Sequence, residues 1–503
     1  MSKHSAKFAA LFARKPLDAL LKESQDDTKL KRALGPLQLI ALGLGAVIGV
    51  GIFVATGSAA NSVAGPSLML SYVVAGITCV FAALCYAEFA SMVPVAGSAY
   101  TYAYATMGEF FAWIIGWDLV LEYGVASAAV GVGWSSYFKS IAETIGINIP
   151  QALSESPWRY NTEIGQFVST GSIINLPAAL VIIVITAILI KGISESSAFN
   201  VIMVCIKLAA ILFVIAAGIF LVNSANWEPF APFGWTGVSF FGYNVAGQAG
   251  QGGAPTGMLA GAAIIFFAYI GFDSVSTCTE EAKNPRRDVP IGIVVSLLIC
   301  TVLYVGMTAV LTGMVKYNEL DLNAPVAIAF RQHGLGWAEM IISAAGVAGI
   351  TSVLLVMMLS GPRIFLAMAR DGLVPKSLFG AVHPKFQTPW KSSILIGFFI
   401  LLLASFGPID FLLHLTNIGT LLAFVIVCAA VPVMRYTHPD AKRPFKCPWV
   451  PVIPALGVIT CLMLMFSLPV GNWWRLLGWL GLGVVIYFAY GFRHSELNKF
   501  RNR

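Results

Sequence analysis

The chain has 503 residues, of which 58% are hydrophobic and only 11% are charged, and its mean hydropathy is +0.81. This composition excludes a soluble globular protein and indicates a chain that crosses a membrane many times. The net charge of +7 does not indicate a nucleic-acid-binding protein, because no basic segment is interleaved with exposed aromatic residues as a binding groove requires.

Twelve segments are candidates for membrane-spanning helices, each of which needs roughly 20 mostly apolar residues to cross about 30 Å of hydrocarbon. They are predicted at residues 36–62, 67–92, 98–138, 177–191, 198–222, 258–283, 289–314, 338–370, 391–406, 409–433, 449–470 and 474–492. The third and eighth segments are long enough to be tilted or broken. The predicted fold class is therefore an all-α integral membrane protein with twelve transmembrane helices.

The distribution of Lys and Arg predicts the orientation, since cytoplasmic loops carry the excess of these residues. With the N-terminus inside, about 24 of the 31 basic residues are cytoplasmic and about 5 are external. We therefore expect a multi-pass protein of the cell membrane, with cytoplasmic tails at residues 1–34 and 493–503.

Two of the predicted spans contain residues that should interrupt a helix. The sixth span has Gly271 and Asp273 at mid-depth, and the first span is crowded with glycines, namely Gly43, Gly45, Gly49 and Gly51. Paired interruptions in corresponding spans of two halves indicate the binding site of a transporter.

The spacing of the two interruptions predicts an internal repeat. A unit of five helices crosses the membrane an odd number of times, so a second copy must be inserted upside down. We expect a first repeat at residues 35–225, a second repeat at 226–434 and two additional helices at 435–492. The first and sixth spans would be the broken first helices of this 5+5 inverted-repeat core.

A broken helix in a membrane provides backbone groups for a ligand, because unpaired N–H and C=O groups cannot face lipid. The N-terminus of a half-helix favours a carboxylate, whereas exposed carbonyl oxygens accept hydrogen bonds from an ammonium group. An amino acid carries both groups on one carbon, so it is the expected ligand. The alternative is that the glycines only permit close packing between helices.

Several motifs occur in a fixed order along the chain. They are the glycine-rich first span, Pro-Val-Ala-Gly-Ser-Ala-Tyr at 94–100, Asn-Trp at 226–227 followed by Pro-Phe-Ala-Pro-Phe-Gly at 229–234, the sixth span closing with Glu280 and Glu281, Asn-Pro-Arg-Arg at 284–287, Met-Ala-Arg-Asp-Gly-Leu-Val-Pro at 368–375 and Arg-Pro-Phe-Lys-Cys-Pro at 443–448. Over roughly residues 31–490 the chain resembles the amino acid, polyamine and organocation (APC) transporter superfamily. Within it, the chain is most similar to the cationic amino acid transporter family in its bacterial twelve-span form.

The resemblance implies a substrate site formed mainly by backbone. The substrate carboxylate is expected on the amides near Gly49, Val50 and Gly51, and the amino group at carbonyls around Val47, Ile48, Phe267, Ala268 and Ile270. Many relatives have Ser or Thr where this chain has Val50. Only the backbone contact is therefore carried over at this position.

Lys207 is the most informative single residue of the fifth span. It lies about 13 Å along the helix that begins at Ala198, and its neighbours in the sequence offer no counter-ion. The alternative to a buried ammonium is a side chain that extends to the membrane surface, but charged residues within spans are functional candidates by default. The resemblance implies that a fifth-span lysine replaces the sodium ion of sodium-coupled members, beside the hydroxyls of Thr351 and Ser352.

Other polar residues in the spans allow two interpretations. Glu122 either faces the substrate side chain or is a buried acid bonded to a neighbouring group, and Asp273 either contacts the substrate or caps the following half-helix through the N–H of Val275 or Ser276. Phe267 and Met357 either line the pocket or pack in the core. Arg363 either belongs to a cytoplasmic gate or pairs with an acid such as Glu88 or Glu109, and Asp118 has no assigned role.

These features predict a secondary active transporter that takes up L-amino acids, cationic or small and neutral, together with protons. The closest alternative is an amino acid/polyamine exchanger. A membrane-embedded enzyme and a channel are rival classes, but the sequence has no clustered catalytic motif and no selectivity-filter loop. We expect no cofactor, no metal and no nucleic-acid partner, whereas the exact substrate and the oligomeric state stay open.

Overall fold

The computed structural model describes residues 12–16, 34–93, 98–161, 166–191, 196–241, 243–250, 254–279, 282–386 and 388–497. Part of the motif at 94–100, the acidic residues Glu280 and Glu281, and most of the two predicted tails lie outside these residues.

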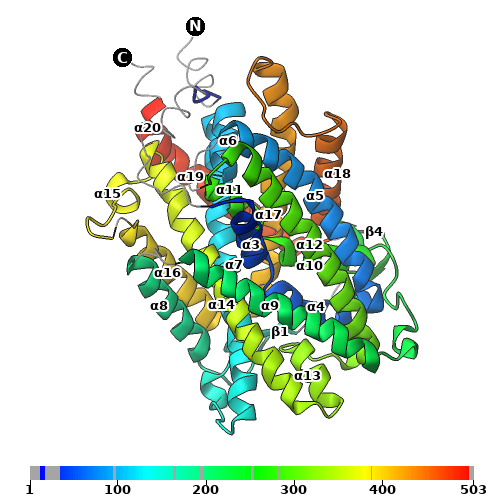
Figure 1. Ribbon diagram of the computed structural model, residues 1–503. Coiled ribbons are helices and arrows are strands. Elements are labelled where there is room, and N and C mark those ends of the chain that lie inside the picture. Colours follow the sequence, from blue (N-terminus) through cyan, green and yellow to red (C-terminus); the bar gives the residue numbers. More distant parts are fainter. Residues whose placement is uncertain are drawn as a thin grey trace.

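The described part of the chain is mainly helical (Figure 1). The longer helices are α3 (Pro36–Val47), α5 (Leu68–Met92), α6 (Ser98–Thr106), α7 (Glu109–Thr144), α8 (Leu176–Lys191), α9 (Ser196–Gly218), α10 (Met258–Ile265), α12 (Pro285–Met314), α13 (Pro325–Gln332), α14 (Gly336–Arg370), α16 (Trp390–Phe406), α17 (Ile409–Thr437), α18 (Val452–Phe466) and α19 (Val470–Ile486). The short helices α4 (Thr56–Ala59), α11 (Ser274–Thr277), α15 (Lys376–Phe379) and α20 (Phe492–His494) complete or connect them. Single turns of 3-10 or π-helix join several of these elements.

Short strands occur in the connections, which the all-α prediction did not include. Three antiparallel pairs form: β1 (Trp158–Asn161) with β2 (Gln166–Ser169), β3 (Val238–Phe240) with β4 (Tyr243–Ala246), and β5 (Gln248–Ala249) with β6 (Pro255–Thr256). None is part of a predicted span, so the membrane-embedded core is made of helices.

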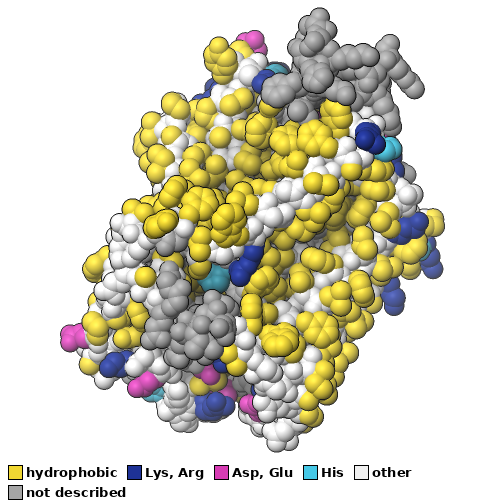
Figure 2. All heavy atoms as spheres, turned by 180° about the vertical axis from the view of Figure 1, so that it is seen from behind, with side chains coloured by type: hydrophobic (Ala, Val, Ile, Leu, Met, Phe, Trp, Pro, Cys, Tyr) yellow, Lys and Arg dark blue, Asp and Glu magenta, His cyan; other side chains and the backbone are white. Residues whose placement is uncertain are grey.

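Eight described helices are long and apolar enough to cross a membrane, and four shorter apolar helices accompany them. The shorter ones are α3, α8, α16 and α18. Hydrophobic side chains are spread over much of the face seen in Figure 2, and charged side chains lie mainly toward its edges, apart from a basic side chain near its middle. This surface is the one expected of a multi-pass membrane protein, and the number of twelve spans stays a prediction.

The helices pack in two main groups. Helices α3 and α5 pack with α12, and α10 packs on α5, while α7 runs along α14 and also contacts α8, α16 and α17. Helix α9 touches members of both groups, since it contacts α3, α12 and α14. The two groups meet around the broken helices near the centre of the molecule (Figure 1).

The structure interrupts both spans in which the sequence predicts a break. Helix α3 ends at Val47, Ile48 is extended with φ −76° and ψ 103°, and helical structure resumes as a π-helical turn from Gly51. The sixth span consists of α10, a 3-10 turn (Phe266–Tyr269) and α11, and Gly271 between them has φ +114°. This left-handed φ would strain any residue with a side chain. A Cβ at this position would also lie only 2.9 Å from the carbonyl oxygen of Ala46.

The two longest predicted spans behave differently. The third is divided at residues 107 and 108, where Gly108 has φ +105°, so the long helix α7 begins at Glu109 rather than at residue 98. The eighth is one unbroken helix, α14, although it contains Pro362.

Both ends of the described chain lie at the same end of the helical bundle. Lys15 forms a 2.7 Å ion pair with Asp371, and the N–H of Glu496 donates to the carbonyl oxygen of Asp371 at 3.0 Å. An even number of membrane crossings requires this arrangement. The side of the membrane on which these ends lie stays a prediction.

Candidate functional site

The two broken segments touch each other directly. A Cβ atom on Gly51 would overlap the backbone of Ala268, and a Cβ on Gly49 would lie 2.7 Å from Cγ2 of Val353 on α14. Ile48, Val50 and Ile270 are also almost completely buried. The glycines therefore serve close packing in this conformation, as the alternative interpretation holds, and that packing also brings the backbone of both breaks together.

Tyr304, on α12, bridges the two breaks. Its hydroxyl lies 3.0 Å from the carbonyl oxygen of Val47 and 3.0 Å from that of Ala268. These are two of the carbonyls at which the family resemblance places the substrate amino group. A single O–H donor thus occupies the position between the two breaks, and a substrate ammonium that binds here has to compete with it.

Lys207 lies in the middle of α9 and is completely buried. Its Nζ donates to the carbonyl oxygens of Gly45 at 2.6 Å and Ile48 at 3.0 Å, and to Oγ of Ser352 at 3.3 Å. The side chain therefore does not extend to the membrane surface. Its ammonium satisfies two carbonyl oxygens that the end of α3 leaves without helical partners.

The expectation that Thr351 also lies beside Lys207 is not met. Thr351 accepts a hydrogen bond from Nε1 of Trp134 at 2.9 Å and donates to the carbonyl oxygen of Val347 at 2.7 Å. Successive residues of an α-helix are about 100° apart, so Ser352 and Thr351 face different neighbours. Among the two hydroxyls, the structure brings only that of Ser352 to the ammonium.

Asp273 directly precedes α11, which begins at Ser274, but its side chain does not cap the helix in the predicted way. The N–H groups of Val275 and Ser276 donate to the backbone carbonyls of Phe272 and Asp273, and the Asp273 side chain forms no capping bond. Its Oδ2 accepts instead from the hydroxyl of Tyr123 on α7 at 2.5 Å. This bond joins the sixth-span break to the helix group of α7 and α14.

Glu122 precedes Tyr123 and is 1% exposed. In the described part of the chain, neither of its carboxylate oxygens has a hydrogen-bond partner. The hydroxyl of Thr420 lies nearby, but it donates to the carbonyl oxygen of Thr416 at 3.1 Å. The hydroxyl of Thr420 is thus the neighbouring group that could bond Glu122, and the two interpretations of this acid stay open.

Apolar side chains surround the breaks. Phe267 and Met357 are 3% and 2% exposed, and Val50 packs against Gly133 of α7. These positions agree equally with a pocket lining and with core packing, so the two interpretations of Phe267 and Met357 stay open.

Two further polar side chains, in addition to Tyr304, hold the broken helices in place, and sequence reasoning missed all three. Nδ2 of Asn417 on α17 donates to the carbonyls of Ala263 and Ile264 at 2.9 and 2.8 Å, just before the sixth-span break. The hydroxyl of Tyr137 donates to the carbonyl of Phe53 at 2.7 Å. Like Tyr304, both are polar residues within apolar spans, which is the signal that could have identified them.

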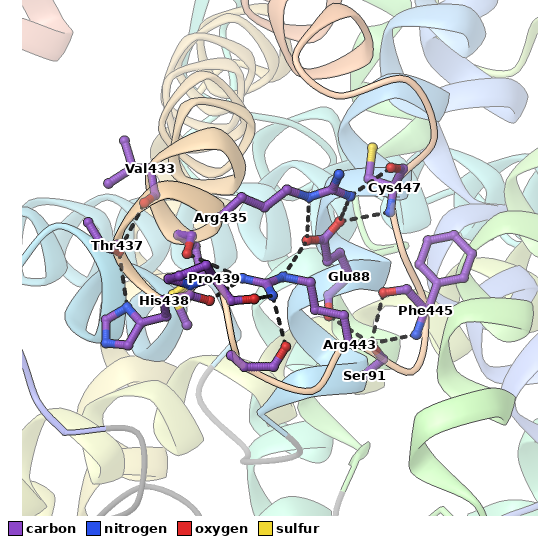
Figure 3. A network of polar contacts seen from close by, with 12 residues as sticks. Glu88, Ser91, Val433, Arg435, Thr437, His438, Pro439, Arg443, Phe445 and Cys447 are labelled. Atoms are coloured by element: carbon purple, nitrogen blue, oxygen red, sulfur yellow. Dashed lines mark hydrogen bonds and ion pairs between the residues drawn. The ribbon is translucent and has the colours of Figure 1, made fainter.

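A separate polar network lies at the end of α5 (Figure 3). Glu88 accepts from Arg435 at 2.7 and 3.1 Å and from the N–H of Cys447 at 2.7 Å, and Nε of Arg443 lies 3.4 Å from its Oε1.

Glu109 lies in a different set of contacts. It accepts from Tyr104 at 2.8 Å, from Tyr487 at 2.9 Å and from Ser495. In the described part of the chain, both acids that were considered as partners of Arg363 thus contact other groups. Nη1 of Arg363 donates to Sγ of Cys278 at 3.8 Å.

Comparison with known proteins agrees with this architecture. The family model described as "Amino acid permease" matches residues 34–489. The chain therefore belongs to the amino acid permease family, within the APC superfamily that its motifs indicate.

Its relatives include named transporters from bacteria and plants. The chain is 45% identical to the branched-chain amino acid permease BcaP of Bacillus subtilis, over 97% of this chain and 99% of the relative. It is 43% identical to a methylthioribose transporter of Bacillus subtilis, over 98% and 100%. It is 36% identical to the vacuolar cationic amino acid transporter 4 of Arabidopsis thaliana, over 86% and 68%.

Proposed function

We propose that this protein is a secondary active transporter that takes up L-amino acids together with protons by alternating access. The observation that carries the proposal is the contact between two broken helices, with the carbonyls of Val47 and Ala268 bridged by Tyr304. Family membership supports amino acid transport, while proton coupling and the substrate are part of the proposal.

In this proposal the two ends of the substrate bind backbone groups. The N–H groups of Gly49, Val50 and Gly51 head the second half of the first span and receive the carboxylate. The ammonium binds the carbonyls around Val47, Ile48, Phe267, Ala268 and Ile270, and it displaces the hydroxyl of Tyr304. A single hydrogen-bond donor is thereby replaced by a group with three donors.

The substrate side chain is expected beside Phe267, Met357, Val50 and Glu122. Three of these residues are apolar, which suits a branched-chain or small neutral amino acid, and the carboxyl of Glu122 suits a cationic one. The names of the relatives include both classes. We therefore propose a broad range that covers neutral amino acids and extends to cationic ones.

Lys207 is the proposed coupling residue. In its protonated form the ammonium holds the carbonyls of Gly45 and Ile48 against Ser352 on α14. Loss of the proton weakens this tie and lets α3 move relative to α14. A proton shifts the equilibrium because it stabilises one arrangement more than the other.

A binding screen with purified protein tests the proposed substrate class. Thermal unfolding is followed with each of the twenty amino acids, with their amides and with the decarboxylated amines agmatine and putrescine. At least one amino acid should raise the unfolding temperature, whereas its amide and its decarboxylated form should not. Equal binding of agmatine and arginine would move the protein to the polyamine class.

Methylthioribose is a second candidate substrate, because a methylthioribose transporter is as similar to this chain as the amino acid permease is. This sugar has neither an ammonium nor a carboxylate, so it could not use the complementary backbone ends described above. Adding it to the same screen separates the two candidates. Stabilisation by methylthioribose alone would contradict the amino acid proposal.

A further inference from the structure

Three buried acids lie together behind the break in the sixth span. Asp118 and Glu122 are one helical turn apart on α7, so their side chains share a face. Tyr123, next to Glu122, bonds Asp273 at 2.5 Å. Asp118, Glu122 and Asp273 are 1%, 1% and 0% exposed, and we refer to them as the acid cluster.

The acid cluster lacks the partners that buried carboxylates normally have. In the described residues, both oxygens of Asp118 and both oxygens of Glu122 have no hydrogen-bond partner. The hydroxyl of Tyr86 on α5 is a second, independent observation. It is fully buried, has no hydrogen-bond partner within this part of the chain, and lies near Asp273 and Glu122. Such groups normally bond one another, water or a ligand.

Neighbouring helices bring no described cation to the acid cluster. Charged side chains on the packed helices have contacts elsewhere: Glu339 of α14 with Arg331, Arg435 of α17 with Glu88, Arg475 of α19 with Asn472, and Arg363 of α14 with Cys278. The titratable groups that do face the cluster are the phenols of Tyr86, Tyr102 and Tyr123. Gly419 packs directly on Asp118, and Thr420 lies beside Glu122.

Three acids in this setting cannot all be ionised. An unpaired buried carboxylate is costly and like charges nearby add to the cost, so protonation is the usual outcome. A metal ion is not the expected ligand, since no group of three metal-binding side chains in ligand geometry occurs among the described residues. A proton needs no cavity, because it forms an O–H bond on one carboxylate oxygen.

We propose that the acid cluster is a second proton-binding site that loads and releases one transported proton, in addition to the proton exchanged at Lys207. The proposal rests on the transport function proposed above. The proton is taken from water on one side of the membrane when a carboxylate becomes a carboxylic acid, and it returns to water on the other side when that O–H bond breaks.

The position of the cluster explains how this proton acts on the protein. Lys207 holds the break of the first span through the carbonyls of Gly45 and Ile48. The acid cluster holds the break of the sixth span through the bond from Tyr123 to Asp273. Each broken helix is then held by a hydrogen bond that includes a titratable group, Lys207 for the first span and Asp273 for the sixth, and protonation of Asp273 weakens the bond that it accepts from Tyr123.

Infrared spectroscopy tests the proton site without any substrate. The C=O stretching band of protonated carboxyl groups is recorded while the pH of the purified protein is varied. The band should lose intensity as the pH rises, and Glu122→Gln and Asp118→Asn should each remove part of that change. The control Glu339→Gln should not alter it, because Glu339 is paired with Arg331 at 3.1 Å. A band that is absent, or that both cluster variants leave unchanged, overturns the proposal.

Flux measurements in proteoliposomes test the transport role. We expect two protons per amino acid in the wild type and in Glu339→Gln, and one in Asp118→Asn, whose amide imitates a permanently protonated acid. An unchanged ratio in Asp118→Asn, or a ratio of one in the wild type, contradicts the second proton. If the wild type moves no amino acid at all, the transport function itself fails, and the infrared result alone decides whether the cluster binds a proton.

Discussion

Nζ of Lys207 lies 2.6 Å from the carbonyl oxygen of Gly45, on the half-helix that ends at the first break. The stem of the same side chain packs on α14, where a Cβ on Gly349 would approach Cβ of Lys207 to 3.1 Å. The residue therefore links the broken first span to α14, an unbroken helix of the opposing group. A change in the protonation of Lys207 therefore alters the contact between the first span and α14, which must move relative to each other during alternating access.

Replacing Tyr304 by Phe should destabilise the free protein and strengthen substrate binding. The variant leaves the carbonyls of Val47 and Ala268 without their donor, which costs about 1–3 kcal/mol for buried groups. A substrate ammonium then meets no competitor, so affinity should rise by up to roughly tenfold. Thermal unfolding with and without substrate measures both effects.

Tyr137→Phe is the matched control for this prediction. It also removes a hydroxyl that bonds a first-span carbonyl, that of Phe53, but this carbonyl lies beyond the break. It should lower stability without raising affinity. Weaker substrate binding in Tyr304→Phe would show that the hydroxyl binds the substrate rather than competing with it.

Leucine at Gly49 or Gly51 should abolish substrate binding while the protein still inserts into the membrane. A side chain at either position collides with Val353 or with the backbone of Ala268, so the two breaks separate and the backbone site is lost. Gly478→Leu is the control, because a Cβ at Gly478 meets nothing within 4 Å. Near-normal uptake by both variants would show that these glycines serve only helix packing and do not form the substrate site.

Glu88→Gln should lower stability much more than the loss of a surface ion pair. Glu88 is 2% exposed and contacts two arginines, so its neutralisation leaves guanidinium groups without their counter-charge and costs about 3 kcal/mol. Lys376→Gln breaks the exposed pair with Glu496 and should cost less than about 1 kcal/mol. Unfolding temperatures in detergent compare the two variants, and similar losses would mean that the network in Figure 3 contributes little.

The positions of the two breaks could be predicted because glycines and a carboxylate are costly inside an apolar helix: the first break site carries several glycines, and the sixth-span break carries Gly271 and Asp273. The partner of each freed carbonyl could not be predicted in the same way. Tyr304 and Asn417 come from spans far along the chain, and only packing decides which carbonyl each one reaches.

Thr351 shows a second limit of sequence reasoning. Adjacent helical residues point in directions about 100° apart, and the sequence does not specify the rotation of α14 about its axis. Ser352 faces Lys207, whereas Thr351 faces Trp134. Asp273 shows a third limit, because local capping was expected and a distant hydroxyl on α7 competed for the carboxylate successfully.

Uptake of an identified amino acid into proteoliposomes, driven only by an inward proton gradient, tests the central claim most directly. The wild type and the control Cys205→Ala, an exposed residue of the same helix, should accumulate substrate, and replacing external sodium by choline should change nothing. Lys207→Ala should fold and still bind substrate, but it should reach only equal concentrations on the two sides, since alanine cannot tie the carbonyls of Gly45 and Ile48. Full accumulation by Lys207→Ala, or strict sodium dependence in the wild type, would contradict proton coupling through Lys207.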